Sequence, residues 1–208
     1  MAINFTSMNN NTTPVEVSPV SSGVSLNLTK NSVLDLTKAA PSLNRVKLCA
    51  GWDVAACGSD FDLDISVFML NNNGKITSGS DVVFYNNPSV RGVSLNGDNR
   101  TGRGDGDDET IDIDLNELAS SIDKIVCCVT IDQAIARRQT FGMVNHSYVR
   151  LVNADTNKEL CKFELKDNGS TDTAMVFAEL VRNGNAWAFH TIGEGKNADL
   201  NGLAAMFS

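Results

Sequence analysis

The amino-acid sequence predicts an all-β protein: an antiparallel β-sandwich with a few short helices. Short apolar stretches recur at a spacing of roughly 8 to 12 residues, and turn-forming residues separate them. The chain has 208 residues, of which 42% are hydrophobic and 20% are charged, so its composition is that of a globular protein and excludes wholesale disorder. This length fits one β-sandwich domain with an additional segment.

The strands are expected where an apolar stretch lies between turn signals. Apolar and polar residues alternate in 111–115 and 160–165, which is typical of half-buried antiparallel strands. Residues 124–131 are apolar on both faces and therefore predict a central strand, in which the neighbours Cys127 and Cys128 face opposite sides. The full set of expected strands is 46–48, 63–70, 81–85, 111–115, 124–131, 147–152, 159–165, 174–181 and 186–192.

Turns and helices complete the expected domain. Asn-Gly and Asn-Pro clusters at 72–74, 86–88, 167–169 and 183–185 predict turns between strands. Residues 116–121 and 200–207 are each expected to form one or two helical turns. Residues 1–22 are rich in Asn, Ser, Thr and Pro and are interpreted as a flexible N-terminal extension, with the domain spanning 23–208.

Charge and cysteine content narrow the function classes. Seventeen Lys and Arg stand against 25 Asp and Glu, giving a net charge of −8, which argues against binding to nucleic acids. No apolar run reaches the roughly 18 residues of a membrane helix, and residues 1–22 lack the pattern of a signal peptide. Five cysteines without CxxC spacing fit free thiols in a reducing compartment, so a cytoplasmic location is expected.

The most unusual segment is the acidic loop, which we define as residues 97–109. From Asp98 to Glu109 it contains five carboxylates, one Asn and one Thr, with three interspersed glycines. Such a loop repels itself unless a cation neutralises it, and Ca²⁺ takes roughly six to eight oxygen ligands in flexible geometry. Glycines allow the tight backbone that would turn carbonyl oxygens inward. The loop alone is equally compatible with a solvated acidic hairpin, and its spacing is not that of an EF-hand.

A second acidic pair lies on an expected strand. Asp62, Asp64 and Ser66 share one face, and about 7 Å separates the two acids along the strand. Phe68 and Leu70 continue the same face, so the carboxylates are expected to lie beside a core and to need a counter-charge. We expect the acidic loop to lack one, whereas a cation shared by strand and loop would provide it. The alternative is a pair of ordinary acids at an exposed strand end.

Together these segments resemble the tellurium-resistance TerD family. The resemblance runs in order from about residue 23 to about residue 195, and the acidic loop is its most specific part. The matching blocks are Gly51-Trp52-Asp53, Phe61-Asp62-Leu63-Asp64, Val83-Phe84-Tyr85-Asn86, 97–109, Val129-Thr130-Ile131, Gln139-Thr140-Phe141-Gly142, Arg150-Leu151-Val152-Asn153 and Thr173-Ala174-Met175-Val176-Phe177.

The family resemblance implies a stress-response β-sandwich that binds calcium through clustered acidic residues. Carried over to this sequence, it implies the metal ligands Asp62, Asp64, Asp98, Asn99, Thr101, Asp105, Asp107, Asp108 and Glu109, with Gly102 and Gly104 offering backbone carbonyls. The implied partners are calcium ions and other stress-response proteins, with any association with a membrane surface made through those partners. Residues 1–22 precede the usual start of the family.

Three function classes follow from these observations. The leading one is a calcium-binding, non-enzymatic module whose metal orders the loop and shapes a surface for partners. The second is a metal-assisted hydrolase, which needs an open coordination position and a general base. The third is a module that binds a small ligand or peptide beside the same cluster. The sequence contains no nucleophile elbow, Walker loop, dinucleotide fingerprint or HExxH motif.

Overall fold

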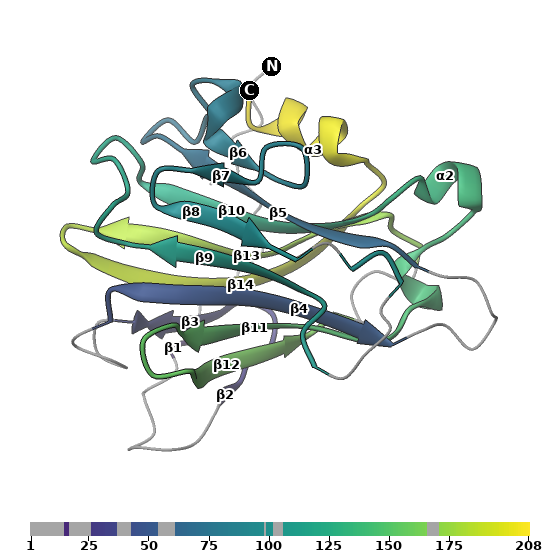
Figure 1. Cartoon of the computed structure of the whole chain (residues 1–208), viewed down its shortest axis with the longest axis horizontal. Coiled ribbons are helices and arrows are strands. Elements are labelled where there is room, and N and C mark those ends of the chain that lie inside the picture. The colour runs from purple at the N-terminus through teal and green to yellow at the C-terminus, as the bar shows by residue number, and fades with distance from the viewer. Residues whose placement is uncertain are drawn as a thin grey trace.

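The computed structural model describes residues 15–16, 26–36, 43–53, 61–97, 99–101, 106–165 and 171–208. Within these residues the chain forms two seven-stranded sheets, which pack face to face (Figure 1). The predicted antiparallel β-sandwich is therefore confirmed. No helix among the described residues is long and apolar enough to cross a membrane.

The first sheet is built around the predicted central strand. In spatial order it contains β1 (Val15–Glu16), β3 (Ser32–Asp35), β14 (Ala186–Lys196), β13 (Ala174–Asn183), β10 (Lys124–Ile131), β5 (Leu63–Leu70) and β6 (Val82–Val83). All neighbours are antiparallel except β1 and β3, which are parallel. Because β6 is only two residues long, it pairs with Val67 and Phe68 and leaves the first half of β5 without a strand on that side.

The second sheet carries the acidic residues of β9. Its order is β2 (Leu26–Asn27), β12 (Lys158–Glu164), β11 (Asn145–Asn153), β4 (Arg45–Asp53), β9 (Glu109–Asp114), β8 (Val93–Asn96) and β7 (Ser89–Val90). Short helical segments occupy the connections: the 3-10 turns η2 (Gly79–Asp81) and η3 (Phe141–Met143), and the α-helices α2 (Ala134–Arg137) and α3 (Leu200–Met206).

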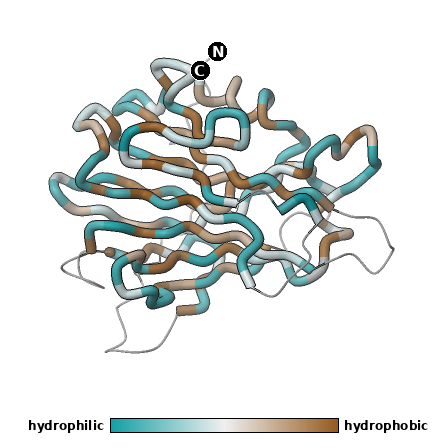
Figure 2. Tube along the Cα trace, in the orientation of Figure 1, coloured by the Kyte–Doolittle hydropathy of each residue, from teal (hydrophilic) through white to brown (hydrophobic). Residues whose placement is uncertain are grey.

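Two apolar clusters hold the layers together. The larger fills the space between the sheets, and hydrophilic and hydrophobic residues alternate along many strands as a result (Figure 2). The smaller lies on the outer face of the first sheet, where α3 covers Phe68, Leu70 and Val126. Cys127 belongs to the inner cluster and Cys128 to the outer layer, so the expectation that they face opposite sides is confirmed.

The predicted strands all overlap observed ones, and the predicted C-terminal helix is confirmed by α3. The predicted helix at 116–121 is wrong, because that segment forms turns: Asn116 N–H donates to Asp114 Oδ1, and Ile122 N–H donates to Ala119 O. An aspartate that binds the backbone two residues later favours a turn over a helix. Two residues of the predicted N-terminal extension, Val15–Glu16, pair with β3, and the predicted turn at 167–169 lies outside the described residues.

The covering helix gives a first testable prediction. Leu203 is fully buried in the outer cluster, so Leu203→Ala is expected to lower the free energy of unfolding by about 2–5 kcal/mol through lost burial and a residual cavity. Ile135→Ala is the matched control, because Ile135 is 84% exposed. Urea denaturation measures both variants. Equal stabilities for the two variants would contradict the packing of α3 on the sheet.

Candidate metal site at one end of the sandwich

The fold brings the starts of β5 and β9 to the same end of the molecule, although they are far apart in the sequence. Glu109, the first residue of β9, is 1% exposed and points between the sheets. Its Oε2 accepts a hydrogen bond of 2.7 Å from the N–H of Ile65 in β5. β6 does not reach Ile65, so the carboxylate of Glu109, and not a neighbouring strand, accepts the hydrogen bond of this backbone N–H. The acidic loop and β5 therefore contact each other at Ile65, while the shared cation stays a prediction.

Trp52 makes a second connection at the same end. It lies near the end of β4, and its indole Nε1 donates to Phe61 O (3.1 Å) just before β5. Its backbone N–H donates to Asp108 Oδ2 (2.9 Å) in the acidic loop. Trp52 is 3% exposed, so its indole bond to Phe61 is shielded from water, while the bond to Asp108 is partly buried. One buried residue therefore fixes the position of the loop relative to both β4 and β5.

Asp62 and Asp64 occupy the positions that strand periodicity predicted. They are only 5% and 9% exposed, and they precede Ser66, Phe68 and Leu70 on the outer face of β5. The hydroxyl oxygen of Ser66 is buried and has no hydrogen-bond partner within the described residues. The outer face of β5 therefore changes from polar oxygens at its start to apolar packing under α3.

The expectation that the loop offers no counter-charge is wrong. Arg100, a loop residue, places its Nε 3.5 Å from Asp62 Oδ2. The side chain of Arg100 is 70% exposed, whereas that of Asp62 is 6% exposed. An ion pair with one partner in water contributes little, so Arg100 offsets only part of the cost of burying Asp62.

Asn99, Thr101 and Asp108 form one hydrogen-bonded group within the loop. Asn99 Nδ2 donates to Asp108 Oδ1, while Asn99 Oδ1 accepts from the backbone N–H of Thr101 (3.1 Å) and from its hydroxyl (3.2 Å). Burial raises the pKa of Asp108, and the nearby negative charges of Asp107 and Asp53 raise it further. Burial therefore outweighs the hydrogen bonds from Trp52 and Asn99, which lower the pKa of Asp108.

Asp107 differs from its neighbour because a cation already binds it. Arg150 of β11 donates from Nε to Asp107 Oδ1 (2.8 Å) and from Nη2 to Oδ2 (2.7 Å). Tyr148 OH donates to the same carboxylate (3.2 Å), and Arg150 Nη1 donates to Glu159 (2.9 Å). Burial alone would raise the pKa of Asp107, but the bonds from Arg150 outweigh it and hold that pKa below its usual value.

The remaining predicted ligands cannot be located. Asp98, Gly102, Gly104 and Asp105 lie outside the described residues. Among the residues that the structure does describe, no three His, Cys, Asp or Glu side chains are arranged as a metal-binding group. The described part of the site is thus a set of oxygen donors on a rigid support, and the ligand set predicted from the sequence stays a prediction.

Sequence reasoning missed the residues that support the loop. Arg150 and Tyr148 lie on β11, two strands away from β9. Arg150 begins one of the blocks that resemble the TerD family, but nothing in the sequence connects it or Tyr148 to the acidic loop. Gly51 on β4 leaves room for this support, since a Cβ there would lie 2.5 Å from the Tyr148 ring. His146 Nδ1 lies 2.7 Å from Asp53 Oδ2, with both side chains exposed, so Asp53 faces a histidine at the rim.

Comparison with known proteins decides the family. The family model described as the TerD domain matches residues 24–207, nearly the whole chain. The chain belongs to the TerD family. It is 45% identical over 187 residues to the tellurium resistance protein TerD of Serratia marcescens, covering 88% of this chain and 97% of that protein. It is 41% identical over 185 residues to general stress protein 16U of Bacillus subtilis (strain 168), covering 87% and 96%.

Solved structures support the same fold. A crystal structure of a protein described as of unknown function superposes with a TM-score of 0.67 at 28% identity, covering 78% of this chain and 95% of that one. A Streptomyces coelicolor A3(2) homologue of the telluride resistance protein TerD gives a TM-score of 0.66 at 24% identity, with 78% and 96% coverage. The chain is therefore a TerD-family protein of the tellurium-resistance and general-stress type. The names of these relatives state no catalytic activity.

The Asp107–Arg150 pair predicts a structural effect that is independent of metal. Arg150→Met, measured by urea denaturation in EGTA, is expected to lower the free energy of unfolding by about 1–3 kcal/mol, because it leaves the half-buried Asp107 without its charged donor. Arg91→Met is the matched control: Arg91 pairs with Glu117 at the surface and is 79% exposed. If both variants lose equally little stability, Arg150 does not support the loop.

Proposed function

We propose that this TerD-family chain is a calcium-binding, non-enzymatic stress-response module. In this proposal the strand acids Asp62 and Asp64 and the acidic loop hold Ca²⁺ together, and the metal orders the loop into a surface for other stress-response proteins. The observation that carries the proposal is the contact between the acidic loop and the start of β5. Glu109 of the loop accepts a hydrogen bond from the backbone of Ile65, and Arg100 of the loop forms an ion pair with Asp62.

The donor chemistry fits calcium. The available groups are carboxylate, carboxamide and hydroxyl oxygens from Asp62, Asp64, Asn99, Thr101 and Asp108, and hard oxygen donors suit Ca²⁺. Asp62 and Asp64 are buried beside a core, where a nearby positive charge stabilises a carboxylate. The unpartnered hydroxyl of Ser66, next on the same face, is a further neutral oxygen.

The proposed ligands fall into two groups. Asp107 and Glu109 already bind Arg150 and the backbone of Ile65, so their first role is to hold the loop in place. The other proposed ligands are Asp62, Asp64, Asn99, Thr101 and Asp108, with Asp98, Asp105 and the carbonyls of Gly102 and Gly104. Of these, Asp108 and Asn99 also have hydrogen-bond partners, but neutral ones: the N–H of Trp52 and Thr101. When bound, the metal supplies positive charge to this cluster, which neutralises the repulsion between the carboxylates.

A structural or regulatory metal is favoured over a hydrolytic one. Metal-assisted hydrolysis needs a base within reach of a bound water. At this end of the described structure the histidine is His146, which is bound to Asp53 at an exposed rim. The resistance and general stress names of the relatives are compatible with a module that acts through partners.

The chain is expected to bind calcium in preference to magnesium. Many oxygen ligands on a flexible glycine-rich loop suit Ca²⁺, whereas Mg²⁺ demands tight octahedral geometry and retains its waters. At 100 times the dissociation constant, binding only to the native state adds about 2.7 kcal/mol, so EGTA should lower the melting temperature by several degrees. Calorimetry with each metal and thermal melts with EGTA measure these effects. Magnesium binding as tight as calcium binding, or a melting curve that EGTA leaves unchanged, would oppose the proposal.

The joint site predicts a reversal of sign for Asp64→Asn. With calcium, loss of a ligand charge should weaken binding and lower the melting temperature. In EGTA the same substitution should be neutral or slightly stabilising, because it relieves repulsion between carboxylates. Asp112→Asn is the matched control: Asp112 lies on β9, pairs with Asn96 and Lys47, and is 42% exposed. Its effect should be the same in both conditions.

Calorimetry separates this joint site from a site in the loop alone. If Asp64→Asn retains full calcium affinity while Asp108→Asn abolishes it, the metal belongs to the loop and the strand acids are not ligands. If neither substitution changes the affinity, the metal site lies elsewhere.

A further inference from the structure

A cavity of about 320 Å³ opens at the end of the sandwich opposite to the acidic loop. The course of β4 shows that the cavity and the acidic loop are far apart. Asn44, just before the start of β4, lines the cavity, whereas Trp52, near the end of β4, contacts the loop. Eight residue steps along a strand span roughly 26 Å. The cavity therefore shares no residue with the proposed metal site.

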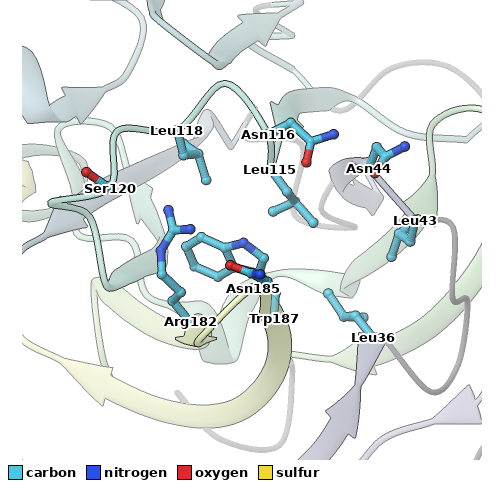
Figure 3. Close-up of a pocket in the computed structure, with 10 residues that line it drawn as sticks. All are labelled: Leu36, Leu43, Asn44, Leu115, Asn116, Leu118, Ser120, Arg182, Asn185 and Trp187. Carbon is cyan, nitrogen blue, oxygen red and sulfur yellow. The ribbon is translucent and has the colours of Figure 1, made fainter.

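The lining combines an apolar base with a polar rim (Figure 3). Leu36, Leu115, Leu118 and Trp187 are buried and belong to the core between the sheets. The rim carries exposed polar side chains from three separate connections: Asn44 before β4, Asn116 and Ser120 after β9, and Asn185 in the β13–β14 turn. Polar groups converging on a concave apolar base are the usual composition of a small-molecule site.

Arg182 is held rigidly in the wall of this cavity. Its Nε donates to Ile122 O (2.7 Å), and its Nη2 donates to Ala119 O (3.3 Å). The guanidinium carbon lies 4.4 Å from the centre of the Trp187 ring, so the planar group also makes a cation–π contact (Figure 3). These contacts fix the orientation of the guanidinium before any ligand arrives.

The charge of Arg182 is not neutralised by an acid. The hydrogen bonds from its Nε and Nη2 go to neutral carbonyl oxygens, and no carboxylate of the described residues makes an ion pair with it. A guanidinium carries five N–H donors, and these bonds use two of them. In a chain of net charge −8, a preorganised cation of this kind at the wall of a cavity is suited to binding an anion.

We propose that this cavity binds a small organic anion whose uncharged part carries hydroxyl groups, the class that includes sugar phosphates and sugar acids. Arg182 receives the phosphate or carboxylate through its unused N–H donors. The side-chain amides of Asn44, Asn116 and Asn185 offer both donors and acceptors, which match hydroxyl groups. A cavity of about 320 Å³ lies at the lower end of the usual range for ligand pockets, so it fits a molecule of monosaccharide size.

The two tryptophans of the chain make the test specific. Trp187 lines the cavity and Trp52 contacts the acidic loop, so each end of the molecule has one indole N–H. In a ¹H–¹⁵N spectrum of the full chain in EDTA, glucose 6-phosphate or gluconate at millimolar concentration is expected to shift the Trp187 indole signal and leave that of Trp52 in place. Trp→Phe variants assign the two signals. Calorimetry on the same samples gives the affinity.

Two variants and one control test the role of the lining. Arg182→Gln is expected to weaken binding about ten- to a hundredfold, because it removes a charged hydrogen-bond donor. Asn116→Ala should weaken binding while leaving the anchor bonds of Arg182 intact, so it keeps the test valid if Arg182→Gln fails to fold. Arg91→Gln changes the same charge at a surface ion pair and should bind normally.

The ligand series separates the possible outcomes. Binding of either charged sugar, but not of glucose, with loss in the variants, supports the proposal and identifies the anionic group. Equal binding of glucose shows that the anion is not needed and overturns it. Inorganic phosphate binding as tightly as glucose 6-phosphate overturns the requirement for an organic part. If none of these probes shifts the Trp187 signal, the cavity is not a site for this class.

Discussion

Within the described part of the chain, β5 has a full-length partner on only one side, and the organisation of the acidic end depends on this constraint. β10 pairs with all of β5, while β6 reaches only Val67 and Phe68. The first half of β5 would otherwise expose backbone N–H groups inside the sandwich, where each unpaired group is costly. The carboxylate of Glu109 binds the N–H of Ile65, and Trp52 binds the carbonyl of Phe61. The loop that supplies Glu109 is consequently fixed beside Asp62 and Asp64.

Strand periodicity predicted the part of this arrangement that depends on local sequence. It placed Asp62 and Asp64 on one face with Phe68 and Leu70, and it identified 124–131 as a central strand. The very short strands β2 and β7 carry too few residues for a period to be visible. The helix expected at 116–121 does not form, because the side chain of Asp114 binds the backbone N–H of Asn116 and a turn results.

The support of the loop could not be predicted, because it depends on strand order. Arg150 reaches Asp107 only because β4 lies between β11 and β9 in the second sheet, so that Arg150 pairs with Cys49 and Cys49 pairs with Thr110. No spacing within the sequence contains that information. The same holds for the cavity at the other end, where Arg182 and Trp187 of one hairpin meet Leu115 and Leu118 from the connection after β9. The composition predicted an acidic chain. It did not predict that carboxylates gather at the end with the acidic loop, or that the guanidinium of Arg182 lies at the opposite end.

The burial of the cysteines has a consequence for redox chemistry. Cys49, Cys127, Cys128 and Cys161 are all buried thiols without a disulfide. Burial raises the pKa of Cys49 and of Cys161 to about 12, and it raises those of Cys127 and Cys128 as well. Since the thiolate is the form that attacks oxidants, electrophiles and soft metal ions, these four side chains stay protonated and unreactive at neutral pH. Oxidising conditions that convert exposed low-pKa cysteines to sulfenic acids are expected to spare these four buried thiols.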